Sequence, residues 1–258
     1  YNTHLAAVAA GVDVNYAGID SLTIEIPMNA KRIPLTLHND FNNMVMHVKN
    51  TNKQCVIFEM IRTPIDIQID KNLLAGNDFT SIPELSDGLC MLILKDETPW
   101  VAQRKDHNYP AIRKDLLFLS NGVAQNSPVT SYMTDTTKPK CSYYKVSSEP
   151  KIIENLTVIR DSLATFKTKC FYVSGENNLI IRDVSIYTPQ NEMYADEAVI
   201  VMDCANVTFK DVTIEGTYSQ VNHSGYGISM NNVWNSQYIR LVGHAKWGIF
   251  GTNNMSKV

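Results

Sequence analysis

The chain has 258 residues, of which 44% are apolar and 19% charged, and its formal net charge is −3. This composition is typical of a folded globular protein, and the lack of a basic tract argues against a nucleic-acid partner. No apolar run approaches the ~20 residues that a membrane-spanning helix needs, so we expect no transmembrane segment.

Residues 1–20 are expected to form an N-terminal cap. The chain starts at Tyr1 rather than Met, so we expect an upstream piece, either an export signal or a trimmed segment, to be absent. Leu5–Ala10 is apolar like the end of an export signal, but Gly11 and a strand-like region follow it. The segment is therefore predicted to be a short capping helix.

Residues 21–123 contain several predicted short strands. Apolar and polar residues alternate in Ser21–Pro27 and in Ile65–Ile69, which is the two-residue period of a strand. Gly88–Leu94 is almost continuously apolar, as expected of a strand that is buried on both faces. Further strands are predicted at Lys31–Leu37, Met44–Lys49, Cys55–Ile61 and Leu116–Leu119. Their spacing suits either a β-sandwich or the first, irregular coils of a solenoid.

Residues 124–140 are polar and include two prolines and four threonines, so this segment is predicted to be the longest loop. The same strand chemistry occurs on both sides of it. We therefore expect residues 1–258 to form a single domain. A small N-terminal module that acts as a cap is the alternative.

Residues 150–258 are predicted to form regular coils of a solenoid. Asn155–Asp161 recurs as Asn178–Ile186 and as Asn206–Ile214, and Ser236–Val242 is a weaker fourth copy. These copies begin 23, 28 and 30 residues apart, and Met255–Val258 resembles the start of a fifth. Repeats of this length, each one supersecondary unit, are typical of solenoid proteins.

The pattern inside each repeat predicts strands. Val207, Phe209, Val212 and Ile214 can face the core while the intervening polar residues face solvent. A second apolar segment follows in every copy, at Phe171–Val173, Ala198–Met202, Tyr226–Met230 and Trp247–Phe250. Two or three short strands per turn, with no helical stretch between them, predict a parallel β-helix. Its inward stacks are expected to include Ile200, Ile228 and Ile249.

Asn155, Asn178 and Asn206 are expected at equivalent corners, because asparagine tolerates the left-handed conformation that a tight corner requires. Stacked coils would set these amides roughly 4.8 Å apart, close enough for a hydrogen-bonded ladder. With these repeats and corners, the chain resembles the right-handed parallel β-helix of the pectate-lyase-like superfamily, most clearly over residues 150–258. The resemblance implies an all-β fold, a polysaccharide or glycan partner and a secreted, periplasmic or bacterial cell-surface location.

The five cysteines are Cys55, Cys90, Cys141, Cys170 and Cys204. Their number is odd and no spacing is typical of a metal knuckle, so all five are predicted to be free thiols. Cys170 and Cys204 fall in successive coils, which leaves one pair as the alternative.

The candidate site lies on the insertions that lengthen individual coils, because insertions in a solenoid collect on one face. They are residues 187–197, 215–225 and 243–246. Carboxylates beside aromatic rings are what sugar binding and glycosidic cleavage use. The predicted catalytic residues are Asp196, Glu197 and His223. The predicted substrate-binding residues are Tyr187, Tyr194, Tyr218, Lys246 and Trp247. Ordinary solvated loops are the alternative interpretation.

A second group of charges lies on the coils themselves. Arg160, Arg182, Lys210 and Arg240 are expected at the same point of successive coils, and an aspartate follows each of the first three. A solvated ladder of ion pairs is the plain interpretation. The functional one is a track for an anionic polysaccharide or, by the pectate-lyase-like resemblance, a calcium site built from stacked aspartates. No cofactor other than this Ca²⁺ is expected.

Three function classes remain open. The motifs expected of a polygalacturonase-like enzyme are missing, and Ser224–Ile228 only echoes one of them. The first class is an exported protein that cleaves glycosidic bonds, as a hydrolase or lyase, in a groove on the β-helix side. The second is a non-catalytic glycan-binding or adhesin-type protein. The third is a stalk like the passenger of immunoglobulin-A-protease-like autotransporters. Further coils or another subunit are expected to cap the end at Val258.

Overall fold

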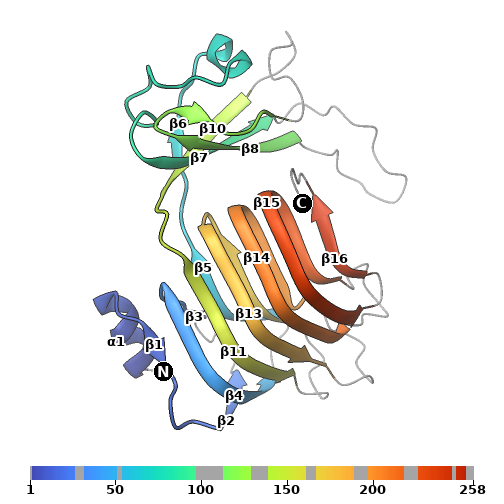
Figure 1. Cartoon of the computed structure of the whole chain (residues 1–258). Helices are drawn as coiled ribbons and strands as arrows, with labels where there is room; N and C mark the ends of the chain where they lie inside the picture. The colour runs from blue at the N-terminus through green and yellow to red at the C-terminus, as the bar shows by residue number, and fades with distance from the viewer. Residues whose placement is uncertain are drawn as a thin grey trace.

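The structure is a computed structural model. It describes residues 2–26, 32–50, 54–96, 113–128, 139–160, 167–188, 197–217, 226–245 and 248–253. The fold is all-β, a right-handed parallel β-helix whose described strands wind through about six turns, together with a second, antiparallel sheet (Figure 1). Within the described residues, no helix is both long enough and apolar enough to cross a membrane.

The chain enters the β-helix through α1 (Asn2–Ala10), which agrees with the predicted helix. The parallel strands then follow in order of the chain. They are β1 (Val14–Asn15), β2 (Ser21–Ile26), β3 (Ile33–Pro34), β4 (His38–Asn50), β5 (Gln54–Ile61), β11 (Lys151–Arg160), β12 (Lys167–Ser174), β13 (Asn177–Tyr187), β14 (Val199–Thr217), β15 (Tyr226–Ala245) and β16 (Gly248–Asn253). Each pairs in parallel with strands of neighbouring coils.

The register of the coils differs from the register predicted for the first repeat. Leu156 pairs with Val184, Val184 with Val212, and Val212 with Leu241, so the coils repeat at 28, 28 and 29 residues. Asn155 therefore lies beside Asp183, not beside Asn178. The prediction was wrong here because Asn and Asp both suit left-handed corners, so an asparagine marks different corners in different coils.

The interior of the β-helix is a stack of apolar side chains. Val207, Phe209, Val212, Ile214 and Ile228 are all at most 1% exposed, which confirms the predicted inward positions. Ile200 was placed wrongly. It is only partly buried, because Val199 and Val201 take the inward positions of that strand and Ile200 alternates outward. The side chain of Ile249 is outside the described part of the chain.

Corners in the left-handed conformation join the strands of each coil. Asn178, Asn206 and Asn235 have φ between 53° and 58° and stack on successive coils. Asn206 donates to the Asn177 side chain at 2.8 Å, and Asn235 donates to Asn206 at 2.5 Å. An amide ladder thus exists over the later coils, but its bonded members are Asn177, Asn206 and Asn235. The predicted members Asn155 and Asn178 donate instead to Asp40 and to the Ser148 carbonyl.

The second sheet consists of antiparallel strands inserted between β5 and β11. They are β6 (Ile65–Ile67), β7 (Leu89–Asp96), β8 (Arg113–Ser120), β9 (Val123–Ala124) and β10 (Pro139–Val146), and the 3-10 helix η1 (Lys71–Ala75) precedes β7. Residues 90–94 of β7 are at most 4% exposed, as expected of a strand covered on both faces. Whether the whole chain is one domain stays a prediction.

The two sheets meet through a small shared core. Phe118 of the antiparallel sheet stacks on Trp234 of the β-helix, with ring centroids 5.1 Å apart. Next to this stack, the Lys114 ammonium lies 2.6 Å from the Asp203 carboxylate, which also accepts from Asn232 at 2.7 Å. Figure 1 shows the antiparallel sheet lying across one end of the strands of the later coils.

Four of the five cysteines are described, and all four are buried free thiols: Cys90, Cys141, Cys170 and Cys204. The alternative pairing of Cys170 with Cys204 is therefore wrong. The side chain of Cys55 lies outside the described residues.

Candidate functional site at the loop edge of the β-helix

The coil insertions all leave the β-helix at one edge, which we call the loop edge. β13, β14 and β15 end there, and β14, β15 and β16 start again from it, so the connections lie on neighbouring coils. Six of the predicted site residues fall in these connections, outside the described residues. They are Tyr194, Asp196, Tyr218, His223, Lys246 and Trp247. Tyr187 and Glu197 are the predicted site residues that the structure describes.

Where strands enter the loop edge, Tyr187, Glu215 and His244 occupy the same position on three successive coils. Ile186 and Ile214, one residue earlier, are fully buried, so the side chains of Tyr187 and Glu215 point outward. Tyr187 as a whole is 37% exposed. An exposed ring next to a carboxylate, one coil apart, offers a stacking surface and a hydrogen-bond acceptor on the same edge.

Where strands leave the loop edge, Glu197 forms an ion pair with Lys169 of the preceding coil. The Lys169 nitrogen lies 3.6 Å from Glu197 Oε2, and the two side chains are 12% and 17% exposed. Sequence reasoning missed Lys169. Its position in the sequence was the signal. Lys169 lies two residues before Phe171, just as Glu197 lies two residues before Val199, and Phe171 and Val199 pair across the coils.

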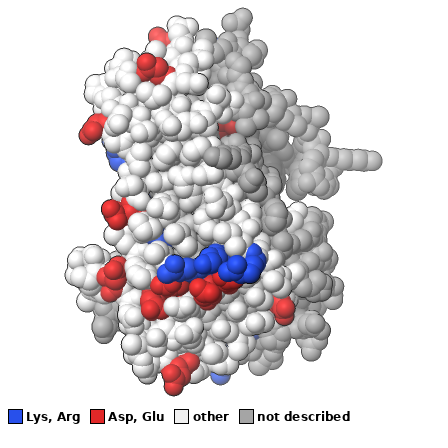
Figure 2. All heavy atoms as spheres, in the orientation of Figure 1, with Lys and Arg blue, Asp and Glu red and all other residues white. Residues whose placement is uncertain are grey.

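A row of charges runs across the coils at a corner away from this edge. We call it the charged ladder: Glu154, Arg182, Lys210, Asp183, Asp211 and Arg240. Glu154, Arg182 and Lys210 are in register on successive coils, while Arg240 lies one position further, beside Asp211. Figure 2 shows basic and acidic side chains gathered in two adjoining bands on the β-helix.

Arg160, which was expected in this ladder, is not part of it. Its position on the coil is that of Thr188, and its side chain is buried and donates to Thr188 Oγ1 at 2.7 Å. Because the coils repeat at 28 residues rather than at the predicted 23, Arg160 lies beyond the corner at which Arg182 stands. Glu154 instead takes the place beside Arg182, so the ladder begins with an acid.

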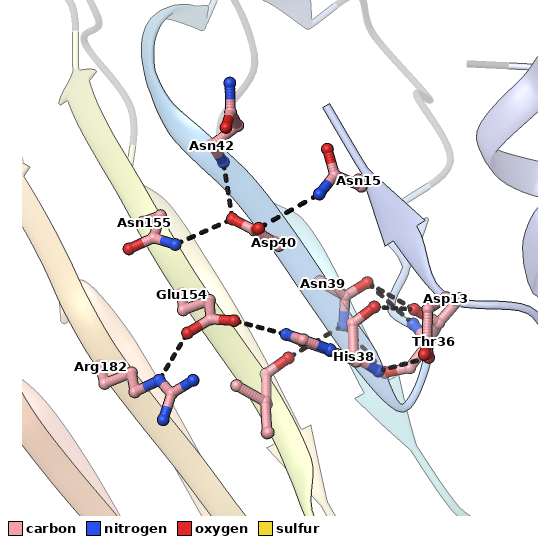
Figure 3. A network of polar contacts seen from close by, with 11 residues as sticks. Asp13, Asn15, Thr36, His38, Asn39, Asp40, Asn42, Glu154, Asn155 and Arg182 are labelled. Carbon is pink, nitrogen blue, oxygen red and sulfur yellow. Dashed lines mark hydrogen bonds and ion pairs between the residues drawn. The ribbon is translucent and has the colours of Figure 1, made fainter. Parts of the chain in front are cut away.

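At the N-terminal end of the ladder, Glu154 lies between His38 and Arg182 (Figure 3). Its carboxylate is 2.5 Å from His38 Nε2 and 2.5 Å from Arg182 Nε. Burial raises the pKa of Glu154, but the hydrogen bonds from Arg182 and His38 outweigh burial and the pKa is lowered. Asp40, the neighbour of Glu154 in register, accepts from Asn155 at 2.9 Å, and this bond lowers the Asp40 pKa.

The ladder is therefore mainly a set of internal ion pairs. Arg240 donates to both carboxylate oxygens of Asp211. Arg182 donates to one carboxylate oxygen of Glu154. For the calcium interpretation, Asp183 and Asp211 do lie on adjacent coils, and Asp161 is outside the described residues. Nowhere in the described part do three or more His, Cys, Asp or Glu side chains gather in a group that could hold a metal ion.

No protein-family model matches the chain, and no curated protein matches it in sequence. Among solved structures, the chain is similar to the tailspike protein gp49 of Pseudomonas phage LKA1, with a TM-score of 0.55 and 12% identity over 97% of this chain. The tailspike gp61 of Pseudomonas phage phi297 matches with a TM-score of 0.45 and 11% identity over 93% of this chain. The chain spans 42% of the first tailspike chain and 41% of the second. The similarity to gp49 is one of fold, a right-handed parallel β-helix.

Proposed function

We propose that this protein binds a polysaccharide at the loop edge of its β-helix and cleaves glycosidic bonds there. The observation that carries the proposal is the arrangement of Tyr187, Glu215 and Glu197 around one edge on neighbouring coils. An exposed ring can stack on the apolar face of a sugar, and carboxylates can bind its hydroxyl groups or transfer protons.

In this proposal, Asp196 and Glu197 are the acid pair and His223 is a further proton-transfer group. Tyr187, Tyr194, Tyr218 and Trp247 stack on sugar rings, and Lys246 binds a polar group of the substrate. A hydrolase needs its two carboxyl groups about 5–5.5 Å apart for retention, or about 6.5–9.5 Å apart for inversion. A lyase needs a base within hydrogen-bond reach of the proton that it removes.

Binding without cleavage is the second candidate, and the Lys169–Glu197 ion pair favours it. A carboxylate held by an ammonium 3.6 Å away, with only 17% of the side chain exposed, is poorly placed to attack or protonate a substrate. The protein would then be a glycan-binding or adhesin-type β-helix, or a stalk. We also propose that the protein acts outside the cytoplasm, secreted, periplasmic or on a bacterial surface, and the fold that it shares with a phage tailspike supports this proposal.

The test is a panel of neutral and acidic polysaccharides, with binding and cleavage measured on the same samples. Cleavage is followed by new reducing ends and by the absorbance of unsaturated products. Asp196→Ala, Glu197→Ala and His223→Ala, made one at a time, are expected to reduce turnover by about 10²-fold or more, because each removes a proton-transfer group.

Asp66→Ala is the matched control, since Asp66 is an exposed acid of the antiparallel sheet, and it is expected to keep full turnover. Full turnover in all three loop-edge variants would place the chemistry elsewhere. Binding of a polymer without any product would favour the non-catalytic candidate.

A further inference from the structure

An outward-facing row of hydroxyl side chains crosses the coils between the loop edge and the charged ladder. Thr157 pairs with Ser185, and Ser185 pairs with Thr213, on three successive coils. Val45 continues the row on the N-terminal side and Val242 on the C-terminal side. We call these five residues the hydroxyl row.

The side chains of the hydroxyl row face solvent because, along each strand, they alternate with side chains that point into the core. On β14, for example, Val212 and Ile214 are at most 1% exposed, so Thr213 between them points to solvent. The three hydroxyl residues are half-buried in the wall, and Val242 is 57% exposed. Adjacent coils place one such side chain about every 4.8 Å along the axis.

The hydroxyl row itself carries no charge, and the groups beside it carry a small excess of acid. The ladder and the loop edge contribute the carboxylates of Glu154, Asp183, Asp211 and Glu215 against the cations of Arg182, Lys210 and Arg240. Both arginines are already engaged by carboxylates. Within the part of the chain that the structure describes, Lys210 makes no ion pair, and Asp211 follows it directly.

Along the described part of this face, a polyanion would therefore meet slightly more repulsion than attraction. An uncharged polymer fits better. Hydroxyl groups of the row can donate to and accept from sugar hydroxyls, while the threonine methyl groups and the valines contact the apolar faces of the rings. Close to the row, Tyr187 adds a ring.

We propose that an uncharged polysaccharide lies along the β-helix axis on the hydroxyl row, bordered by the charged ladder on one side and by the loop edge on the other. This inference rests on the proposed function and adds the substrate class, the direction of the polymer and the surface that holds it. Affinity should rise with oligosaccharide length until the ligand spans the row, because each further coil adds one more contact.

The first arm of the test places a carboxylate in the row. Ser185→Glu and Thr213→Glu are expected to weaken the binding of a neutral polysaccharide by about tenfold or more, because the new charge would have to be desolvated against the sugar. Thr208→Glu is the matched control. Thr208 is an equally half-buried threonine of β14 but lies beyond the corner at Asp211, and this variant should bind normally. Melting temperatures of all three variants report on folding.

The second arm compares a polyuronate with its carboxyl-reduced, uncharged form. The reduced form is expected to bind with an affinity that hardly changes with salt, and the native form to bind at least about tenfold more weakly. Tighter, salt-sensitive binding of the native form would overturn the inference. The inference would also be overturned if Ser185→Glu and Thr213→Glu bound the polymer normally while Tyr187→Ala abolished binding. In that case the proposed function at the loop edge would still stand. If neither form nor any neutral polymer binds, the proposed function itself fails.

Discussion

The parallel β-helix and the antiparallel sheet keep their strands in register by different means. In the β-helix, corner side chains bond to the next coil, as Asn235 does to Asn206 and Asn206 to Asn177. In the antiparallel sheet, the β8–β9 turn at Asn121 and Gly122 is local, with positive φ at both residues, whereas β10 pairs with β6 and β7 from much earlier in the chain. Order in the β-helix therefore depends on one spacing of about 28 residues that repeats from coil to coil, while the antiparallel sheet combines a local turn with long-range strand pairs.

The difference extends to the cores. The β-helix core is one continuous stack that includes the rings of Phe41, Phe58 and Phe171, with centroids 5.2 and 5.5 Å apart. The antiparallel sheet has its own core around Leu92 and Leu117. Among the described residues, a small cluster around Phe118 and Trp234 belongs to both. Separate cores allow each sheet to be destabilised by its own substitutions, and four experiments test whether the two sheets respond separately.

The largest effect is expected from removing a ring or a large side chain from each core. Phe209→Ala should cost about 3–5 kcal/mol and Leu92→Ala about 2–5 kcal/mol, since both residues are fully buried. Denaturant unfolding measured with probes in each sheet checks both values. If the two sheets are independent, each variant shifts the midpoint of its own sheet. A shared shift in both probes would show one cooperative unit. Val123→Ala, at an exposed position, is the control.

The corner of the β-helix should be next in magnitude. Asn206→Ala is expected to cost about 2–4 kcal/mol, because alanine is strained at a φ of 53° and two side-chain hydrogen bonds are lost. Asn206→Gly keeps the backbone unstrained and should cost less, so the difference between the two variants measures the strain.

Asn121→Ala makes the same change in the antiparallel hairpin, where φ is 47°. It should cost less than Asn206→Ala, since within the described part of the chain the Asn121 side chain makes one hydrogen bond, accepting from the Gly88 backbone N–H at 3.0 Å. An equal cost for the two alanine variants would show that the stacked amides add nothing to the β-helix.

The same contrast explains what could be predicted from the sequence. The inward positions of Val207, Phe209, Val212 and Ile214 and the corners at Asn178 and Asn206 were predictable, because a stacked coil repeats the same requirement at each turn. The antiparallel sheet has no repeat, so its strands at 89–96 and 113–120 were predicted as strands without their partners. The register of the first repeat was wrong because Asn155 and Asp183 fill the same corner with different residues. At the loop edge, Tyr187 and Glu197 could be proposed from the insertions, but Lys169 was missed, because its offset from Phe171 becomes informative only once Phe171 and Val199 are known to pair.

The contact between the two sheets should give a smaller effect. Lys114→Met removes the cation that lies 2.6 Å from Asp203 and leaves this carboxylate with Asn232 and Tyr144 as partners. We expect a loss of about 1–2 kcal/mol, less than for a fully buried pair, because 23% of the Lys114 side chain is exposed. Hydrogen exchange of β8 and β15 checks it, and faster exchange confined to β8 would show that the ion pair holds the antiparallel sheet to the β-helix.

The smallest effect concerns pH. The hydrogen bond from Asn155 lowers the pKa of Asp40, and this donor comes from another coil, 115 residues away. A carboxyl group with a lowered folded-state pKa contributes stability above its unfolded pKa of about 3.9, and this stability is lost as the pH falls through the folded-state value. Asp40→Asn should therefore flatten the acid limb of the stability curve of the β-helix, by less than about 1 kcal/mol because the group is largely solvated.

Asp78 of the antiparallel part is the matched comparison for Asp40. Its pKa is also lowered, but by hydrogen bonds from Thr80, only two residues away. Such a local contact can partly persist after unfolding, so the pKa should differ less between the folded and unfolded states. Stability measured from roughly two pH units below to roughly two pH units above the unfolded value of about 3.9 should change more for Asp40→Asn than for Asp78→Asn. An equal change in the two variants would contradict the idea that polar contacts between coils, rather than local ones, fix the β-helix.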